Sequence, residues 1–218
     1  MEAKKEVFQA EEVAKLKIQV DCGTLYVKEC PDSSQIEVEV SEDEIGEYSS
    51  SLEDGKLKIR YRIKKKNLHM EDCKTVITVT LPAGKLFEKI KAEIGAGVLD
   101  TQEAALLCDR AKIEVGAGKA KIGSVKTRTL VAECGAGELN VARAALNDAD
   151  ISCGVGKCEI NLEGKSTDYH FDLNYGIGKI YVNGEKVSRK DGNRQAAGEA
   201  AGTIHVDCGV GVIRLNVG

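Results

Sequence analysis

Several residue types and patterns are scarce in this chain of 218 residues, and each absence narrows the possible folds and functions. The sequence has no Trp, only two Pro and 4% aromatic residues, which disfavours a wide core filled by large rings. No apolar stretch approaches the roughly 18 residues of a membrane span, and Met1 to Glu6 contain no apolar signal segment. We therefore expect no membrane span in this chain. It either remains in the cytoplasm or, if an export segment precedes these residues, belongs to the cell envelope.

Net charge and cysteine spacing argue against further classes of protein. The net charge of −4 gives no support for nucleic-acid binding, and we expect no nucleic-acid partner. None of the eight cysteines follows the Cys-x-x-Cys spacing of zinc or redox motifs. Cys134, Cys153, Cys158 and Cys208 instead occupy positions that Val or Ile fill elsewhere in the pattern described next. Cysteine there behaves as a small apolar residue, so we predict buried, reduced thiols and no disulfides.

What the sequence does contain is one recurring unit, an apolar strand, a Gly-x-Gly corner and a second apolar strand. The first glycines of the six units are 21, 19, 19, 22 and 33 residues apart. A period near twenty is typical of solenoids. The glycine pairs are Gly95 and Gly97, Gly116 and Gly118, Gly135 and Gly137, Gly154 and Gly156, Gly176 and Gly178, and Gly209 and Gly211.

Apolar residues keep the same register around each corner. They stand one, three and five residues before the first glycine, and two and four after the second, as in Ile90, Ala92, Ile94, Leu99 and Thr101. Such alternation predicts strands with one buried face, whose equivalent residues stack in rows about 4.8 Å apart. The glycines then mark corners where positive φ or a close backbone approach excludes a side chain. The sequence thus predicts an all-β fold, a single-stranded β-helix of short coils.

We expect one continuous domain. Residues 1–81 supply irregular strands that form an N-terminal cap, with a first coil near 16–27 in which Asp21 and Gly23 fill the two glycine positions. Residues 82–218 form the regular coils, with an insertion loop near 187–203. The chain closes with a strand over 212–217. We predict that this last strand has one unpaired edge, which favours self-association.

The repeated units, the irregular N-terminal strands and the closing run from Cys208 to Val217 resemble a bacterial family known as putative adhesins, a domain of unknown function. The resemblance covers nearly the whole chain. It implies a β-helix and an adhesin-like binding role. The shared positions are glycines and core residues, so the resemblance assigns no catalytic residue.

We predict no cofactor, no metal and no catalytic site. The weak candidate for a cation site is an outward row of carboxylates, which Lys91 and Lys112 neutralise in part. A hard cation such as Ca²⁺ could bridge stacked carboxylates, but such ions need six to eight oxygens, and a solvated polar face is the favoured interpretation. The row comprises Glu93, Glu114, Glu133, Asp150 and Asp172.

Three functional hypotheses remain open. The first is a non-enzymatic interaction protein, an adhesin or envelope-associated module that binds an unknown protein or glycan. The second is a self-assembling structural protein similar to the bactofilins, joined through its C-terminal edge. The third is an enzyme acting on glycans. It is disfavoured because outward aromatic residues that could stack on sugars are few, Tyr181 being the main one.

Overall fold

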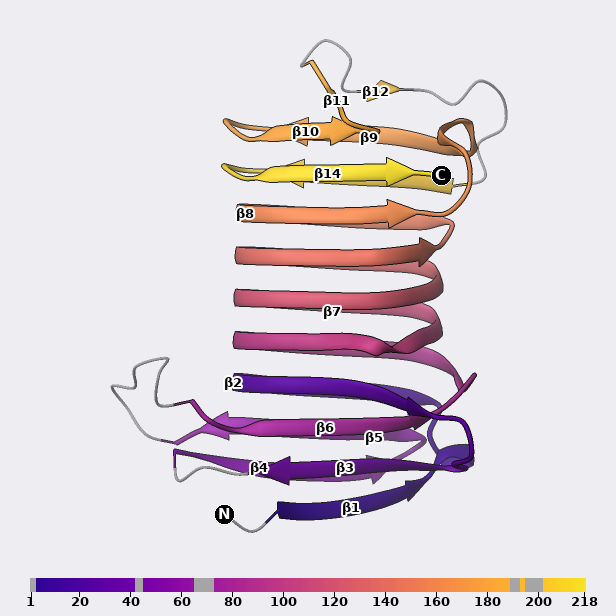
Figure 1. Ribbon diagram of the computed structural model, residues 1–218, viewed down its shortest axis with the longest axis vertical. Helices are drawn as coiled ribbons and strands as arrows, with labels where there is room; N and C mark the ends of the chain where they lie inside the picture. The colour runs from indigo at the N-terminus through magenta and orange to yellow at the C-terminus, as the bar shows by residue number, and fades with distance from the viewer. Residues whose placement is uncertain (1–2, 42–44, 65–72, 189–192, 195–201) are drawn as a thin grey trace.

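A computed structural model describes residues 3–41, 45–64, 73–188, 193–194 and 202–218. These residues are all-β: they include no α-helix, only the short 3-10 helices η1 and η3, and their fourteen strands join in one mixed sheet. Figure 1 shows turns of chain stacked along the long axis. The elements are β1 (Ala3–Gln9), η1 (Ala10–Glu12), β2 (Lys15–Cys30), β3 (Gln35–Ser41), β4 (Gly46–Glu53), β5 (Lys56–Ile63), β6 (Val76–Pro82), β7 (Leu86–Ala145), β8 (Asp148–Leu162), η3 (Ser166–Asp168), β9 (Tyr169–Tyr175), β10 (Lys179–Val182), β11 (Glu185–Lys186), β12 (Asn193–Arg194), β13 (Gly202–Cys208) and β14 (Val212–Val217).

The middle of the stack is a parallel ladder of β2, β7 and β8. β7 is one extended stretch of 60 residues that passes through several turns, and it pairs with β2 at its start and with β8 at its end. The register follows the sequence period, because Cys134 lies opposite Cys153 and Val20 opposite Ile94. The expected first coil at residues 16–27 lies within β2, where Gly23 pairs with Gly97.

The inward rows form one continuous hydrophobic core. Both rows that flank the corners are buried, and Leu99, Leu139 and Ile160 have no exposed surface. The side chains are mainly Val, Ile, Leu, Ala and Cys, which agrees with a narrow interior filled by small and branched residues. Period-two alternation thus correctly identifies the buried face.

The corner glycines are required because neighbouring turns approach closely. A Cβ on Gly135 would lie 2.7 Å from the carbonyl oxygen of Gly116, the equivalent glycine of the preceding turn. At Gly118 a Cβ would overlap the carbonyl oxygen of Gly97, and φ is +143°, a conformation that L side chains rarely adopt. Close approach alone therefore operates at Gly135, and both predicted reasons operate together at Gly118.

The N-terminal strands meet the parallel ladder in a mixed arrangement. β5 and β6 pair with β2 in parallel, whereas β1 pairs with β3, β3 with β6, and β4 with β5 in antiparallel fashion. The Glu6 carboxylate on β1 accepts hydrogen bonds from the Tyr48 hydroxyl, at 2.7 Å, and from the Ser50 hydroxyl, both on β4. These contacts tie the two outermost strands together across the end of the core.

The C-terminal turn lies out of sequence order. β13 pairs with β8 on one side and with β9 on the other, and β14 likewise pairs with β8 and β10. Residues 202–217 therefore lie between the turn that contains β8 and the turn that contains β9 and β10, although β9 and β10 come earlier in the sequence (Figure 1). The prediction of an unpaired C-terminal edge is therefore wrong, which removes the basis for expecting self-association through that edge. Leu215 is fully buried, and the Asn183 side chain accepts the Val217 amide at 2.7 Å.

The predicted insertion loop near 187–203 is described only in part. Val187 is buried and its amide bonds to the Ile180 carbonyl, while β12 pairs with β9. Residues 189–192 and 195–201 lie outside the described residues.

A disulfide joins Cys22 and Cys73, contrary to the expectation that none forms. Cys22 stands between Asp21 and Gly23, at the middle position of the first corner, where it lies opposite Ala96. Cys73 lies outside any strand, so inward-row periodicity gave no information about it. Cys134, Cys153, Cys158 and Cys208 are free and buried, as predicted.

Candidate functional site

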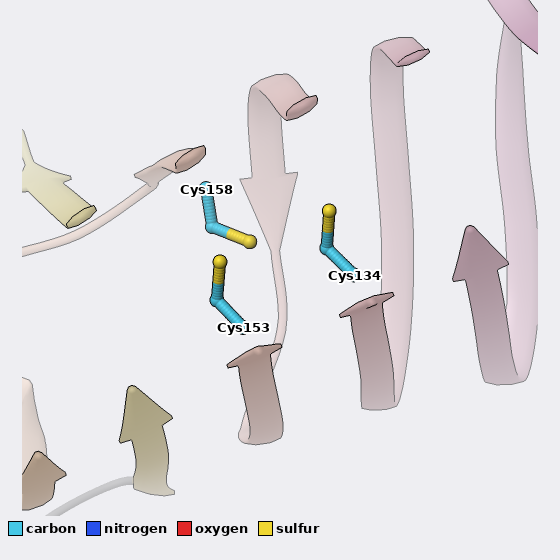
Figure 2. Close-up of side chains that lie close together, drawn as sticks. All are labelled: Cys134, Cys153 and Cys158. Atoms are coloured by element: carbon cyan, nitrogen blue, oxygen red, sulfur yellow. The ribbon is translucent and has the colours of Figure 1, made fainter. Parts of the chain in front are cut away.

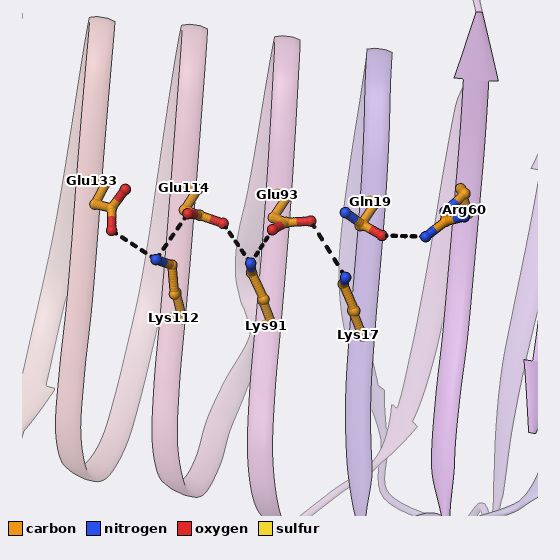
Figure 3. A network of polar contacts seen from close by, with 8 residues as sticks. All are labelled: Lys17, Gln19, Arg60, Lys91, Glu93, Lys112, Glu114 and Glu133. Carbon is orange, nitrogen blue, oxygen red and sulfur yellow. Dashed lines mark hydrogen bonds and ion pairs between the residues drawn. The ribbon is translucent and has the colours of Figure 1, made fainter. Parts of the chain in front are cut away.

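The outward carboxylate row begins as a ladder of alternating lysine and glutamate. Figure 3 shows lysines of one row beside glutamates of the next, with Lys91 and Lys112 each bridging the glutamate of its own turn and that of the next turn. Lys91 Nζ contacts Glu93 and lies 2.9 Å from Glu114, and Lys112 Nζ lies 2.9 Å from Glu114 and 2.7 Å from Glu133. All three glutamates are thus paired with ammonium groups.

The ladder shifts the proton affinities of its members. Burial disfavours the charged form of Glu114, but hydrogen bonds with Glu93, Lys112 and Lys91 outweigh it and lower the pKa of Glu114 to about 2. Hydrogen bonds to Glu133 and Glu114 raise the pKa of Lys112 above its ordinary value. Because both partners keep their charges across the neutral range, the ladder acts as a fixed ion-pair network that holds the register of the turns.

Asp150 and Asp172, the last two members of the predicted carboxylate row, lie at the register of the lysines and not of the glutamates, since Asp150 pairs with Val131 and Ser152 with Glu133. The two aspartates are also not adjacent in space. The inserted strand β13 lies between them, so that His205 pairs with Asp150 on one side and with Asp172 on the other. His205 Nδ1 lies 2.9 Å from a carboxylate oxygen of Asp172. Asp172 therefore has a histidine beside it, a contact that the sequence does not reveal because it does not place β13 between β8 and β9.

An apolar groove crosses four successive turns on another part of the surface. Its volume is about 680 Å³, and its apolar lining includes Leu86, Leu107, Ala145 and Leu146. The Leu86 side chain is 66% exposed. Lys126 and Arg128 lie in the same lining, with Asp109 as the acidic member. This groove combines accessible apolar surface with a net positive rim.

The groove follows the same period as the corners. Leu86, Leu107, Lys126 and Ala145 each stand nine residues before the first glycine of a corner. They therefore occupy equivalent positions of successive turns and form one row. The sequence analysis overlooked this row because it followed the strands next to the glycines. The 21-residue spacing of Leu86 and Leu107 was the signal available.

Three buried thiols form the group in the described chain that could hold a metal ion. The sulfurs of Cys134, Cys153 and Cys158 all lie within 4.8 Å of one another (Figure 2). Hydrogen bonds from Cys153 and Cys158 lower the pKa of Cys134, and the hydrogen bond with Cys134 raises the pKa of Cys153. The sequence predicted Cys134 and Cys153 in one row, but not that Cys158 reaches them across the core.

Among the described residues, no helix is both long and apolar enough to cross a membrane.

No family model matches the sequence, and a search of curated proteins gives no match. Solved structures with a similar arrangement are bacterial proteins named as adhesins. A putative cell adhesion protein from Clostridium sporogenes aligns over the whole of both chains, with 15% identity and a TM-score of 0.48. A putative adhesin from Bacteroides fragilis aligns over 98% of this chain and 97% of its own, with 15% identity and a TM-score of 0.41. A putative adhesin from Parabacteroides merdae aligns over 98% and 95%, with 14% identity and a TM-score of 0.40. This chain is similar to these putative adhesins from several bacteria.

Proposed function

We propose that this chain is a non-enzymatic β-solenoid of the cell envelope that binds a protein partner in the groove beside Leu86. The observation that carries the binding role is the groove itself, which runs across stacked turns and whose lining combines accessible apolar side chains with Lys126 and Arg128.

The solenoid interpretation is supported by register. Equivalent residues of neighbouring turns, such as Leu130 and Ala149 or Leu139 and Cys158, pair in parallel at the 19-residue period of the sequence. Such a stack presents long rows of equivalent side chains on its outside, which suits recognition of an extended partner.

The chemistry of the groove favours a protein over a glycan. Sugars commonly stack on aromatic rings, whereas the lining of this groove is aliphatic, with two cations and one carboxylate. Apolar surface with a basic rim complements a segment that carries apolar and acidic side chains. We therefore expect an acidic, partly apolar protein segment as the occupant.

Support for a non-enzymatic role comes from the state of the outward carboxylates. General acid–base catalysis on glycans uses two carboxyl groups placed on either side of the scissile bond, one of them with a raised pKa. Glu93, Glu114 and Glu133 are instead held by lysines, and the pKa of Glu114 is lowered. These carboxylates form the ion pairs of the ladder.

The envelope location is supported by the bond between Cys22 and Cys73. Disulfides persist in oxidising compartments and are rare in the reducing cytosol.

Site-specific photo-crosslinking in bacterial cells that produce this protein tests the proposal. A photoreactive phenylalanine analogue replaces Leu86 in one protein and Ile177, 83% exposed and outside the groove, in the control. We expect one discrete protein adduct from position 86 and none from position 177. The adduct is identified by mass spectrometry, and the purified partner is then titrated against wild type, Leu86→Ser and Ile177→Ser.

Leu86→Ser should raise the Kd about tenfold, which corresponds to a loss of roughly 1.4 kcal/mol of binding free energy at one apolar contact. Ile177→Ser should bind as wild type does. Absence of an adduct at position 86, equal adducts at both positions, or a glycan adduct would overturn the proposal.

A further inference from the structure

The three converging thiols occupy a part of the core that one turn and its neighbour build together. Cys134 on β7 and Cys153 on β8 are paired positions of adjacent strands. Cys158 follows Cys153 on β8 after the corner at Gly154 and Gly156, so its side chain returns from the opposite wall (Figure 2). The exposed fractions are 2%, 1% and 0%.

The surroundings of this thiol cluster are apolar. The rows beside it contain Ala132, Ile151, Leu139 and Ile160, all fully buried. Among the described residues, the buried polar side chains are three threonines, and none is charged. In the part of the chain that the structure describes, no charged side chain is therefore buried where it could compete with the three sulfurs for a metal ion.

We propose that Cys134, Cys153 and Cys158 form a three-sulfur site for a soft monovalent metal ion, copper(I). Soft thiolate sulfur favours copper(I), together with zinc and iron–sulfur clusters, over harder metal ions. Metal–sulfur bonds of about 2.3 Å in a trigonal arrangement place the sulfurs roughly 4 Å apart, a spacing within the 4.8 Å limit that these three satisfy.

Charge favours a monovalent ion here. Copper(I) replaces the proton of one thiol, which leaves to solvent, and the lone pairs of the other two sulfurs complete the coordination. The resulting group has no net charge, and neither copper nor sulfur changes oxidation state. A divalent ion needs a second thiolate for the same neutrality, and uncompensated charge in an apolar core is costly.

Geometry disfavours structural zinc at the same place. Zinc prefers four ligands in a tetrahedron, with sulfurs less than about 4 Å apart. The nearest further cysteine in the row, Cys208, pairs with Cys153 on the side away from Cys134. Cys134 and Cys208 are therefore two strand spacings apart, roughly 9.6 Å, too far for side chains of this length to share one zinc ion.

Because the sulfurs are buried, the ion must enter during folding. The test therefore uses the full chain with its disulfide intact. The chain is refolded anaerobically with copper(I) and ascorbate. All proteins carry Cys30→Ser, which removes the free cysteine that is partly exposed and could bind copper adventitiously. Copper per chain is measured by elemental analysis after gel filtration.

Two variants remove a ligand and introduce a residue that another turn has in the same row. They are Cys134→Val, as at Val115, and Cys158→Ala, as at Ala120. Two controls remove buried thiols outside the cluster, Cys108→Ala and Cys208→Val. We expect one copper per chain in the parent and the controls, and less than one tenth in the ligand variants. Equal loading of all five proteins, or no copper in the parent, would overturn the proposal.

X-ray absorption at the copper edge of the parent provides a measurement that does not depend on the folding of variants. The site predicts three sulfur neighbours and no nitrogen or oxygen. Nitrogen or oxygen ligands, or two sulfurs alone, would contradict the three-thiol assignment.

Discussion

Replacing Gly137 by Ala tests whether backbone contact between turns sets the need for glycine. A Cβ at this position would overlap the carbonyl oxygen of Gly118 and lie 2.9 Å from its nitrogen and 3.0 Å from its carbonyl carbon. The obstacle is backbone that is fixed in the ladder, so the two turns must separate locally. Overpacking of this kind costs about 3 kcal/mol, and the lower entropy of the unfolded alanine chain returns roughly 0.4–1 kcal/mol.

The net loss in the free energy of unfolding is therefore about 2 kcal/mol. For a chain of this length it lowers Tm by roughly 4–8 °C. Urea denaturation followed by circular dichroism measures the loss. Gly135→Ala, where the Cβ meets a carbonyl oxygen at 2.7 Å, should cost about 1 kcal/mol. Ala136→Ser, at the exposed middle of the same corner, should stay within about 0.5 kcal/mol. An unchanged or raised stability of Gly137→Ala would refute the reasoning.

Three further predictions concern the disulfide, the ladder and the free thiols. Replacing Cys22 and Cys73 by Ala opens a loop with a sequence separation of 51, and the chain-entropy estimate gives a loss of about 4 kcal/mol in denaturant unfolding; a loss below about 1 kcal/mol would speak against the bond. Glu114→Gln should cost about 1–2 kcal/mol at pH 7. Since the Glu114 pKa is lowered to about 2 from 4.5, this difference from wild type should be complete above about pH 4.5 and vanish as the pH falls towards 2; a difference independent of pH would contradict the ladder. Native thiol labelling should modify Cys30 quickly and the five buried free cysteines only on unfolding; rapid labelling of Cys134 or Cys153 would show that their row faces solvent.

Much of the fold could be predicted because the local pattern and the tertiary contacts share one period. Residues such as Val115 and Ala120 keep fixed offsets from a glycine corner, so each turn specifies its own buried face and its pairing with the next. The same reasoning located Asp21 and Gly23 in the first corner. It did not find β1 or β4. In β4 the cause is a serine-rich sequence that shows little apolar alternation.

What could not be predicted depends on contacts that no local period encodes. The 33-residue spacing before Gly209 signals a long connection, but it does not say on which side of the preceding turn the chain returns. The position of β13, and so the contact between His205 and Asp172, follows from that return. The convergence of Cys158 on Cys134 likewise depends on side-chain directions across the core, which row assignments alone do not give.

Nuclear Overhauser effects across the last turns test the central claim, a stack of paired turns with the final one inserted. The amide of Gly209 donates to the Cys153 carbonyl at 2.9 Å, and the amide of Gly176 donates to the Cys208 carbonyl at 2.9 Å. We predict interstrand effects from residues 204–208 to both 149–153 and 171–175. Direct effects between 149–153 and 171–175, as a stack in sequence order requires, would contradict the account.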